Sequence, residues 1–362
     1  RHHSMQSVFE VSWQRLSDEE QRALRKVSIF QGGFEKEAAQ TVADVDLTLL
    51  LSLLNKSFVW RDNTGRFSQH PLILQYVGQK ANDYPEDKKQ SEEKHGLYYA
   101  EWFSKKAPDL GTLKNNEILE VFEKEFPNVR RAWNWMLREK RVEEIPNFAR
   151  FLSDFFTALL NGHEGTEMFR QATLVLDAGN PQHHRALGYA LIQQAYCESM
   201  FGRGDIASPI KMIEHGLELL EPLKDYLGIM QGQFTLGIVI RERGEFVKSK
   251  EFLTSALELA KCYGHSFEIG RIYSHLIITE FQLDGFADLI EPRLKELREL
   301  GHPLALGFPL TFFGSYLVHH NRLEEGEKLL LESLELLQKL QDKSFIAFTL
   351  NDLAKLAYKR SL

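Results

Sequence analysis

The fold is decided by residues 236–256, which read LGIVIRERGEFVKSKEFLTSA. Apolar residues recur at helical spacing on both sides of Gly244, and this glycine interrupts the pattern as a turn between two helices does. Gly237 precedes the turn, and a residue without a side chain there lets two paired helices approach closely. Leu253 and Ala256 follow the turn and share one helix face. The stretch therefore predicts a helical hairpin.

Comparable turns recur at intervals of about 40 residues along the second half of the chain. They are Gly204-Asp205-Ile206, Gly244-Glu245-Phe246, Asp284-Gly285-Phe286 and Asn321-Arg322-Leu323. The positions of Leu253 and Ala256 are matched by Ile213 with Gly216, Leu330 with Ser333, and, after one inserted residue, Leu294 with Leu297. We expect Pro292 to interrupt the helix of that third copy. Such units bury their apolar faces only by stacking, which leaves a concave groove.

The repeat resembles the tetratricopeptide repeat, although its spacing exceeds the usual 34 residues or so and implies longer helices. Residues 5–84 have a different sequence pattern. Ser17 and the three acids after it predict a helix start, and we expect further helices over residues 35–43 and 47–55 and after Pro71. Between them Asp62-Asn63-Thr64-Gly65 predicts the turn of a β-hairpin. Several helices followed by one hairpin are the outline of a winged helix.

The predicted fold class is therefore mainly α: a winged-helix domain followed by a tetratricopeptide-like α-solenoid of helical hairpins. The domain boundaries follow from these changes of pattern. We expect a tag remnant at residues 1–4, a winged-helix domain at 5–84, a helical linker at 85–140 and an extended repeat superhelix at 141–362. The start Arg1-His2-His3-Ser4 has the composition of a His-tag end, and beginning at Met5 without a leader suggests a fragment of a longer protein.

Composition excludes several classes of protein. The 362 residues are 43% hydrophobic and 26% charged, which is ordinary for a globular chain. A formal net charge of −7 argues against a protein that mainly grips nucleic acid. Only two cysteines occur, without metal-binding spacing, so we expect a reducing, cytoplasmic location. No apolar run is long enough to span a membrane.

Several motifs, in order, resemble bacterial STAND-class signalling ATPases, in which a winged helix follows the nucleotide-binding module. The motifs are Val8-Phe9-Glu10-Val11-Ser12-Trp13-Gln14-Arg15-Leu16, Val27-Ser28-Ile29-Phe30-Gln31-Gly32-Gly33-Phe34, Asn55-Lys56-Ser57-Phe58 and Gly65-Arg66-Phe67-Ser68-Gln69-His70-Pro71-Leu72. Tyr98-Tyr99-Ala100, Glu125-Phe126-Pro127-Asn128-Val129-Arg130-Arg131-Ala132-Trp133 and Gly162-x-Glu164-Gly165 are similar to the helical linker of such proteins. Members of the maltose-regulator type end in extended tetratricopeptide sensors.

The resemblance implies a mechanism. In that family the winged helix holds the nucleotide module closed around ADP, and an inducer bound to the repeats favours an open, ATP-bound form that assembles. Gln69-His70-Pro71 stands where the family has Met-His-Asp, so His70 alone carries over as a phosphate contact, and only in a full-length protein. The other interpretation of His70 is a helix-start residue that packs beside Pro71. ADP and ATP are implied for the full-length protein, and no cofactor for this fragment.

The sequence predicts no enzyme activity for this fragment, because no G-x-x-x-x-G-K-[ST] phosphate loop and no catalytic constellation occur in it. No metal site is predicted either, since His183-His184 and His319-His320 are adjacent pairs that point apart on a helix.

The predicted partner is a protein, peptide or small-molecule inducer in the repeat groove, together with the chain's own nucleotide module. If the register is right, the groove is lined by a mixture of aromatic, basic and hydroxyl side chains, which suits a peptide or small polar ligand. They are Gln194, Glu198, Gln231, Phe234, Arg241, Arg271, Ser274, Ile278, Phe281, Phe308, Thr311, Ser315 and His319. An ordinary solvated groove is the other interpretation.

Two functions follow. The first is a non-catalytic sensor and regulatory arm of a STAND ATPase, possibly a transcription regulator, with the winged helix restraining the nucleotide module. The alternative is a DNA-binding winged-helix regulator whose repeats dimerise or bind a co-regulator. Against the alternative, Lys56, Arg61 and Arg66 around the wing are few for neutralising phosphates, and nucleic acid is not an expected partner.

Overall fold

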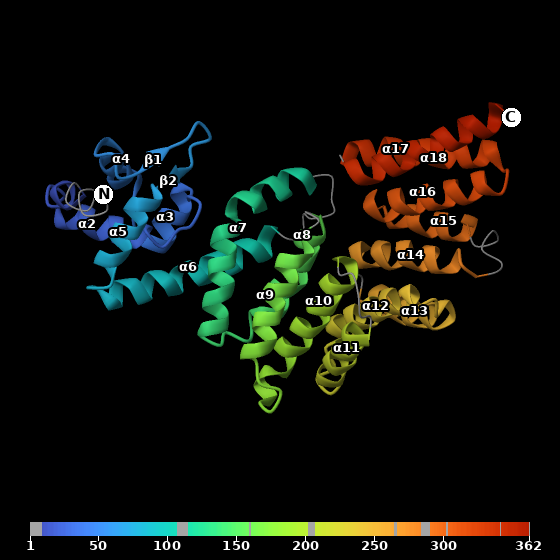
Figure 1. Ribbon diagram of the computed structural model, residues 1–362, viewed down its shortest axis with the longest axis horizontal. Helices are drawn as coiled ribbons and strands as arrows, with labels where there is room; N and C mark the ends of the chain where they lie inside the picture. The colour runs from blue at the N-terminus through green and yellow to red at the C-terminus, as the bar shows by residue number, and fades with distance from the viewer. Residues whose placement is uncertain are drawn as a thin grey trace. The chain divides into compact units, whose positions relative to one another are not determined.

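The computed structural model describes most of the chain, in two compact units that each have their own core (Figure 1). The described residues are 9–106, 115–158, 161–201, 207–263, 266–283, 290–301, 303–340 and 342–361. Unit 1 comprises Arg1–Lys106 and Glu120–Glu144, and unit 2 comprises Ala107–Leu119 and Ile145–Leu362. The chain is mainly helical, as predicted, whereas the domain boundaries inferred from the sequence remain predictions.

Unit 1 contains six named helices and one β-hairpin within its described residues. After a helical segment at residues 9–13, they are α2 (Asp18–Val27), α3 (Lys36–Ala43), α4 (Leu47–Asn55), α5 (Pro71–Ala81), α6 (Pro85–Lys106) and the part of α7 (Asn115–Arg138) from Glu120 on. Ser17 caps α2 by accepting a hydrogen bond from the Glu20 amide, and the Glu20 carboxylate accepts one from the Ser17 amide. This reciprocal capping explains why the helix begins where the sequence places it.

The β-hairpin lies where the turn residues predict it. Strands β1 (Trp60–Arg61) and β2 (Phe67–Ser68) are antiparallel, with Trp60 opposite Ser68. The Asp62 carboxylate accepts hydrogen bonds from the amides of Thr64 and Arg66, which closes the turn. Phe67 also pairs through its backbone with Phe34, so the hairpin is tied to the segment before α3. The winged-helix interpretation of this unit remains a prediction.

A buried polar network joins the hairpin to α6 and α7. Arg66 forms an ion pair with Glu125, whose second oxygen accepts from the Tyr99 hydroxyl at 3.0 Å and from the Asn128 amide nitrogen at 2.8 Å. Burial, and then the charge of Glu125, raise the pKa of Tyr99 well above its ordinary value, so its hydroxyl stays a donor. The same Asn128 nitrogen donates to the carbonyl of Gly33 at 2.9 Å.

His95 completes the network on α6. Asn128 Oδ1 accepts from the Gln31 amide, so His95 Nε2, 3.3 Å from that oxygen, must carry a proton and donate it. Burial lowers the pKa of His95 from its ordinary value of 6.5 to about 3. The ring is therefore neutral at pH 7.

The buried His95 makes the stability of unit 1 depend on pH. Below pH 6.5 the unfolded chain binds a proton that the folded chain excludes until about pH 3. The free energy of unfolding should therefore fall by up to about 1.4 kcal/mol for each pH unit between those values. His95→Gln, whose amide can still donate to Asn128, should remove that part of the slope.

Urea titrations between pH 7.5 and 5 check this prediction through tryptophan fluorescence, because Trp13, Trp60, Trp102, Trp133 and Trp135, the chain's five tryptophans, all lie in unit 1. His163→Gln, at an exposed histidine of unit 2, should leave the slope of the fluorescence transition unchanged. An unchanged slope in His95→Gln would show that the histidine is not the group responsible.

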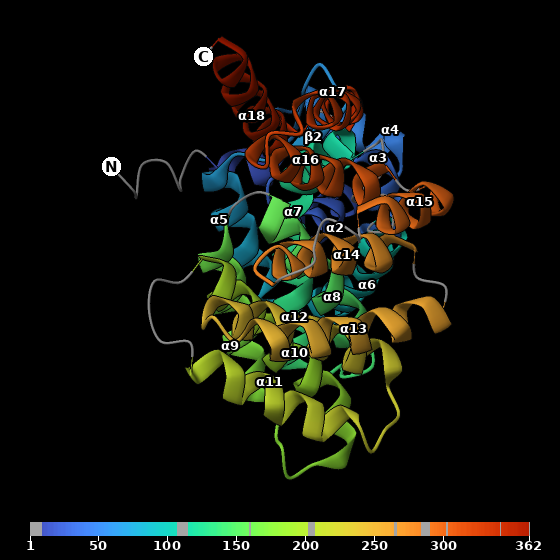
Figure 2. The same cartoon turned by 90° about the vertical axis from the view of Figure 1, so that its right-hand side faces the viewer.

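Unit 2 is a succession of helices from α8 on. They are α8 (Ile145–Ala158), α9 (Gly162–Val175), a short 3-10 turn (Pro181–His183), α10 (His184–Phe201), α11 (Ala207–Leu220), α12 (Tyr226–Glu242), α13 (Phe246–Cys262), α14 (Ser266–Glu280), α15 (Ile290–Leu300), α16 (Pro303–His319), α17 (Leu323–Leu340) and α18 (Lys343–Ser361). Within the unit, α10 packs on α11, α12 on α13 and α16 on α17, while α12, α14 and α16 follow one another (Figure 2). This is an α-solenoid of helical hairpins.

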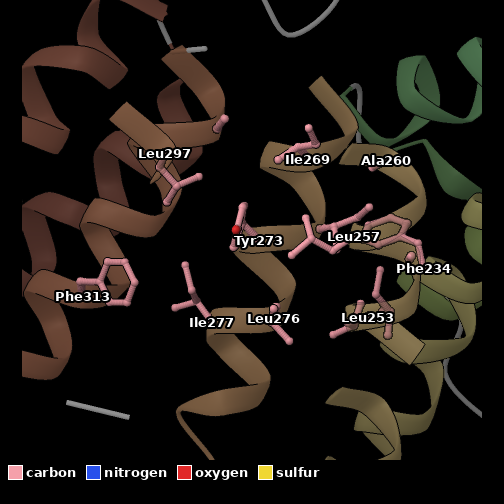
Figure 3. Packing of buried hydrophobic residues seen from close by; sticks show 14 of the residues in the cluster. Phe234, Leu253, Leu257, Ala260, Ile269, Tyr273, Leu276, Ile277, Leu297 and Phe313 are labelled. Atoms are coloured by element: carbon pink, nitrogen blue, oxygen red, sulfur yellow. The ribbon is translucent and has the colours of Figure 1, made fainter. Parts of the chain in front are cut away.

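The repeat positions predicted from the sequence form its core. Ile213, Leu253, Leu294 and Leu330 are each 0% exposed, and Figure 3 shows Leu253 and Leu257 facing Leu276 on α14. Gly237 lets α12 approach α13, because an added Cβ would come 2.7 Å from Leu253 Cγ. These repeat positions are thus core positions of the packed helices.

Two turns of the repeat are described, and both separate paired helices. Gly244, with a positive φ of 78°, ends α12, and Asn321, with a φ of 61°, ends α16. The turns at residues 204–206 and 284–286 lie outside the described residues. Pro292 does not interrupt its helix as expected, because it occupies the first turn of α15, where the missing N–H is not needed. In the described part of the chain no helix is long and apolar enough to cross a membrane.

Candidate functional site

The residues predicted to line the groove lie on the first helices of successive hairpins. Gln194 and Glu198 are on α10; Gln231, Phe234 and Arg241 on α12; Arg271, Ser274 and Ile278 on α14, with Phe281 just after its end; and Phe308, Thr311, Ser315 and His319 on α16. Consecutive helices of this set pack on one another. The set therefore belongs to one continuous row of helices within unit 2.

Five side chains converge where α10, α12 and α14 meet, and we call them the arginine cluster: Tyr196, Phe234, Arg241, Arg271 and His275. The Arg271 guanidinium carbon lies 5.1 Å from the centre of the Phe234 ring and 5.8 Å from that of Tyr196, and a guanidinium nitrogen lies 3.4 Å from the Tyr196 hydroxyl. The Phe234 ring meets His275 edge-on at 5.2 Å. One arginine of α14 thus reaches across α12 to α10.

The arginine cluster is a largely buried site in which two arginines lie beside a neutral histidine and two carboxylates. Arg241 approaches His275 Nδ1 at 3.2 Å, and since an arginine only donates, this nitrogen is the acceptor. Burial, followed by the charges of Arg241 and Arg271, lowers the pKa of His275 well below its ordinary value, so the ring is neutral. The carboxylates of Glu242 and Glu268 lie 3.2 Å and 3.4 Å from the two arginines. Both distances are long for charge-assisted bonds.

The side chains of α10 near the groove form two separate groups of hydrogen bonds. Gln193 donates to Gln231 at 2.8 Å, and Gln194 donates to Glu198 at the same distance. Thr173 on α9 donates to Gln194. These pairs hold the side chains of α10 in fixed orientations beside the arginine cluster.

The residues on α14 and α16 are divided between core and surface. Thr311 has no exposed surface and lies within hydrogen-bond distance of Ser333 and Thr349, and Ser274 is buried and donates to the Gly270 carbonyl. Phe308 stacks on Phe345 of α18 with ring centres 3.9 Å apart. The others are more accessible: Ile278 and Ser315 are half-buried, and Phe281 and His319 are exposed.

Sequence reasoning missed Tyr196 and His275 as site residues. His275 follows Arg271 by four residues, the spacing that places two side chains on one helix face, so the signal was present. Tyr196 gives no such signal in the sequence. Its role depends on a contact with Arg271, 75 residues away, that no local pattern reports.

His70 belongs to unit 1. It is the N-cap of α5, its Nδ1 accepts from the Leu72 amide at 3.2 Å, and its exposed ring meets Trp60 edge-on. The preceding Gln69 is 8% exposed, yet both polar atoms of its side chain have no hydrogen-bond partner. Among the described residues, no group of histidine, cysteine and carboxylate side chains could hold a metal ion.

The basic side chains around the hairpin are engaged within unit 1. Lys56 pairs with Glu20 at 2.6 Å, and this bond, followed by one from Ser52, lowers the pKa of Glu20 to about 2. Arg66 pairs with Glu125 in the buried polar network. Arg61 donates to the Gly65 carbonyl within the turn. Two of the three cations that would meet a DNA backbone are thus already neutralised.

No family model and no curated protein matches the chain. Among solved structures, the chain is similar to a Signal Transduction ATPase with Numerous Domains (STAND) protein with a tetratricopeptide repeat sensor from Pyrococcus horikoshii, at 17% identity and a TM-score of 0.38. The match covers 98% of this chain and 64% of that one. At this TM-score the likeness establishes neither a family nor a function.

Proposed function

We propose that this chain is a non-catalytic sensor and regulatory arm of a signal-transduction ATPase, in which the row of first helices binds an inducer or a protein partner. Unit 1 would restrain a nucleotide-binding module of the same protein. The proposal rests on the motifs that resemble STAND proteins and, above all, on the arginine cluster.

The arginine cluster supports ligand binding because it brings two arginines and two aromatic rings together where three hairpins meet. Arg241 and Arg271 are 12% and 20% exposed, so an anion there would be bound in a partly desolvated place. Charge-assisted hydrogen bonds from arginine are strong and geometrically specific under such conditions. The expected inducer is a peptide or small molecule that carries an acidic group and an apolar part.

The arginine cluster offers a direct test. The melting temperature of the protein would be measured with extract of its source cells, separated by filtration into small-molecule and macromolecular fractions. A ligand that binds only the folded chain raises this temperature. We expect one fraction to raise it, and Arg271→Gln to lose most of the rise, since a hydrogen bond to a charged group contributes about 1.5–3 kcal/mol.

Arg298→Gln is the matched control, because Arg298 is an exposed arginine of α15 that pairs with Glu332. It should keep the full rise. ATP or ADP alone should change nothing. An equal loss in the two variants would count against the arginine cluster, and a rise with random duplex DNA at low salt would favour the DNA-binding alternative instead.

A further inference from the structure

A second candidate binding site lies within unit 1. A cavity of about 400 Å³, open to solvent, is bordered by residues of α2, α5, α6 and α7 and of the segments beside them. Its apolar wall includes Ile29, Leu74 and Ala81, and its polar wall is rich in cations. The volume falls in the range that holds small organic ligands, roughly 300–1,000 Å³. His70 is not among the residues that line this cavity.

Arg25 is the most unusual residue of the cavity wall. It is 9% exposed, and its Nε has no hydrogen-bond partner. Its guanidinium carbon lies over the Tyr84 ring, 3.7 Å from the ring centre. Burying a cation without a hydrogen-bonded counterion costs free energy, which an anionic ligand would offset.

The other charges of the wall leave a positive surplus. Lys26 is neutralised by Asp44 at 3.0 Å, and the one acid, Asp87, is bound by Arg22 from outside the cavity wall at 3.0 Å. Lys88 bonds only to the uncharged amide oxygen of Asn82.

Arg131 on α7 is also weakly balanced. It lies 3.8 Å from Glu92, and that carboxylate is held more closely by Arg138, at 2.7 Å. Burial lowers the pKa of Arg131. Arg25 and Lys88 therefore line the cavity without a paired carboxylate, and Arg131 shares Glu92 with Arg138.

From this surplus we infer that the cavity binds a small phosphate monoester, with the phosphate between Arg25, Lys88 and Arg131 and the organic part against Ile29 and Leu74. A phosphate monoester carries a charge of about −1.5 to −2 at neutral pH, which matches the surplus better than a single carboxylate does. Arginine forks bind phosphate oxygens in pairs. The site is independent of the proposed function, because it lies in the other unit from the arginine cluster.

Phenyl phosphate, inorganic phosphate and succinate are suitable probes, each added at the same ionic strength. Tryptophan fluorescence reports unit 1 alone, so the melting curve followed in this way isolates the site. We expect phenyl phosphate to raise the melting temperature saturably, inorganic phosphate to act more weakly and succinate least. A larger effect of succinate than of either phosphate would overturn the assignment to a phosphate.

Two neighbouring lysines give a matched pair of variants. Lys88 and Lys89 are both exposed residues of α6, but only Lys88 lines the cavity. Lys88→Gln should weaken the apparent affinity for phenyl phosphate about tenfold, the size of one charge-assisted bond, whereas Lys89→Gln should leave it unchanged. Equal effects in the two variants would mean general screening of charge and would overturn the proposal.

Gly78→Met tests the volume of the cavity without altering its charge. Gly78 lies on α5 in the cavity wall, and an added Cβ there has open space around it. The variant should fold as well as the parent protein, because methionine is a better helix former than glycine. Its longer side chain should fill the cavity and abolish binding of phenyl phosphate. Undiminished binding to the folded Gly78→Met protein would place the ligand elsewhere.

Discussion

Gly270→Ala should destabilise unit 2 by up to about 2 kcal/mol, although alanine is the better helix former. The Cβ added at Gly270 on α14 would lie 2.0 Å from the Cβ and 2.6 Å from the Cα of Ala305 on α16. Backbone atoms cannot rotate away as the end of a long side chain can, so the two helices must separate. Overpacking of this kind costs about 1–3 kcal/mol and sometimes more, against a gain of about 1 kcal/mol in helix propensity.

Urea unfolding followed by circular dichroism and by tryptophan fluorescence separates the two units. The dichroism transition of Gly270→Ala should move to lower urea, whereas the fluorescence transition should stay in place. The double variant Gly270→Ala/Ala305→Gly moves the methyl group to the other helix and should recover most of the loss. Costs that simply add in the double variant would show that the two positions are not in contact.

Arg66→Ala should destabilise unit 1 by about 3 kcal/mol, because it leaves the Glu125 carboxylate buried without its cation. Glu125 is 5% exposed and cannot turn to solvent without disturbing α7. The loss should lie at the low end of the range for broken buried pairs, since Tyr99 and Asn128 still donate to the carboxylate. The tryptophan transition in urea measures it.

A double variant that also removes the charge of Glu125 tests whether the unpaired carboxylate causes the loss. Arg66→Ala/Glu125→Gln keeps an oxygen that can accept from Tyr99 and Asn128, and it should be more stable than Arg66→Ala alone. Arg61→Ala, at an exposed arginine in the same hairpin, should stay within about 0.5 kcal/mol of the parent protein. If Arg66→Ala destabilised unit 1 no more than Arg61→Ala does, the ion pair with Glu125 would not contribute to stability.

The repeating part of the fold could be predicted because its signals are local. Ser17 with Glu20, the hairpin turn after Asp62, and Gly244 each act on residues within a few positions. The contacts of residues 125–128 with residues 31–33 could not be found in this way. They depend on side chains about 95 residues apart, and in the sequence the Glu125-Phe126-Pro127-Asn128 motif looked only like part of a linker.

The candidate site was predictable only as a set of helix faces. Spacing placed Arg241, Arg271 and Phe234 on the first helices of the repeat. It could not tell an open face from a buried one, and Thr311 lies in the core between α16, α17 and α18. The cavity beside Arg25 left no trace in the sequence, because its wall comes from four helices whose approach is a matter of tertiary packing.

The reach of Arg271 from α14 to Tyr196 on α10 has a mechanical consequence. In an array whose repeats contact only their neighbours, small changes in the angle between repeats add up along the superhelix. The Arg271 guanidinium links α14 to α12 and, through one long hydrogen bond to the Tyr196 hydroxyl, to α10. An anion that drew the guanidinium away from Tyr196 would break this link and let the angle between the repeats change. Binding at one point would then change the pitch of the superhelix.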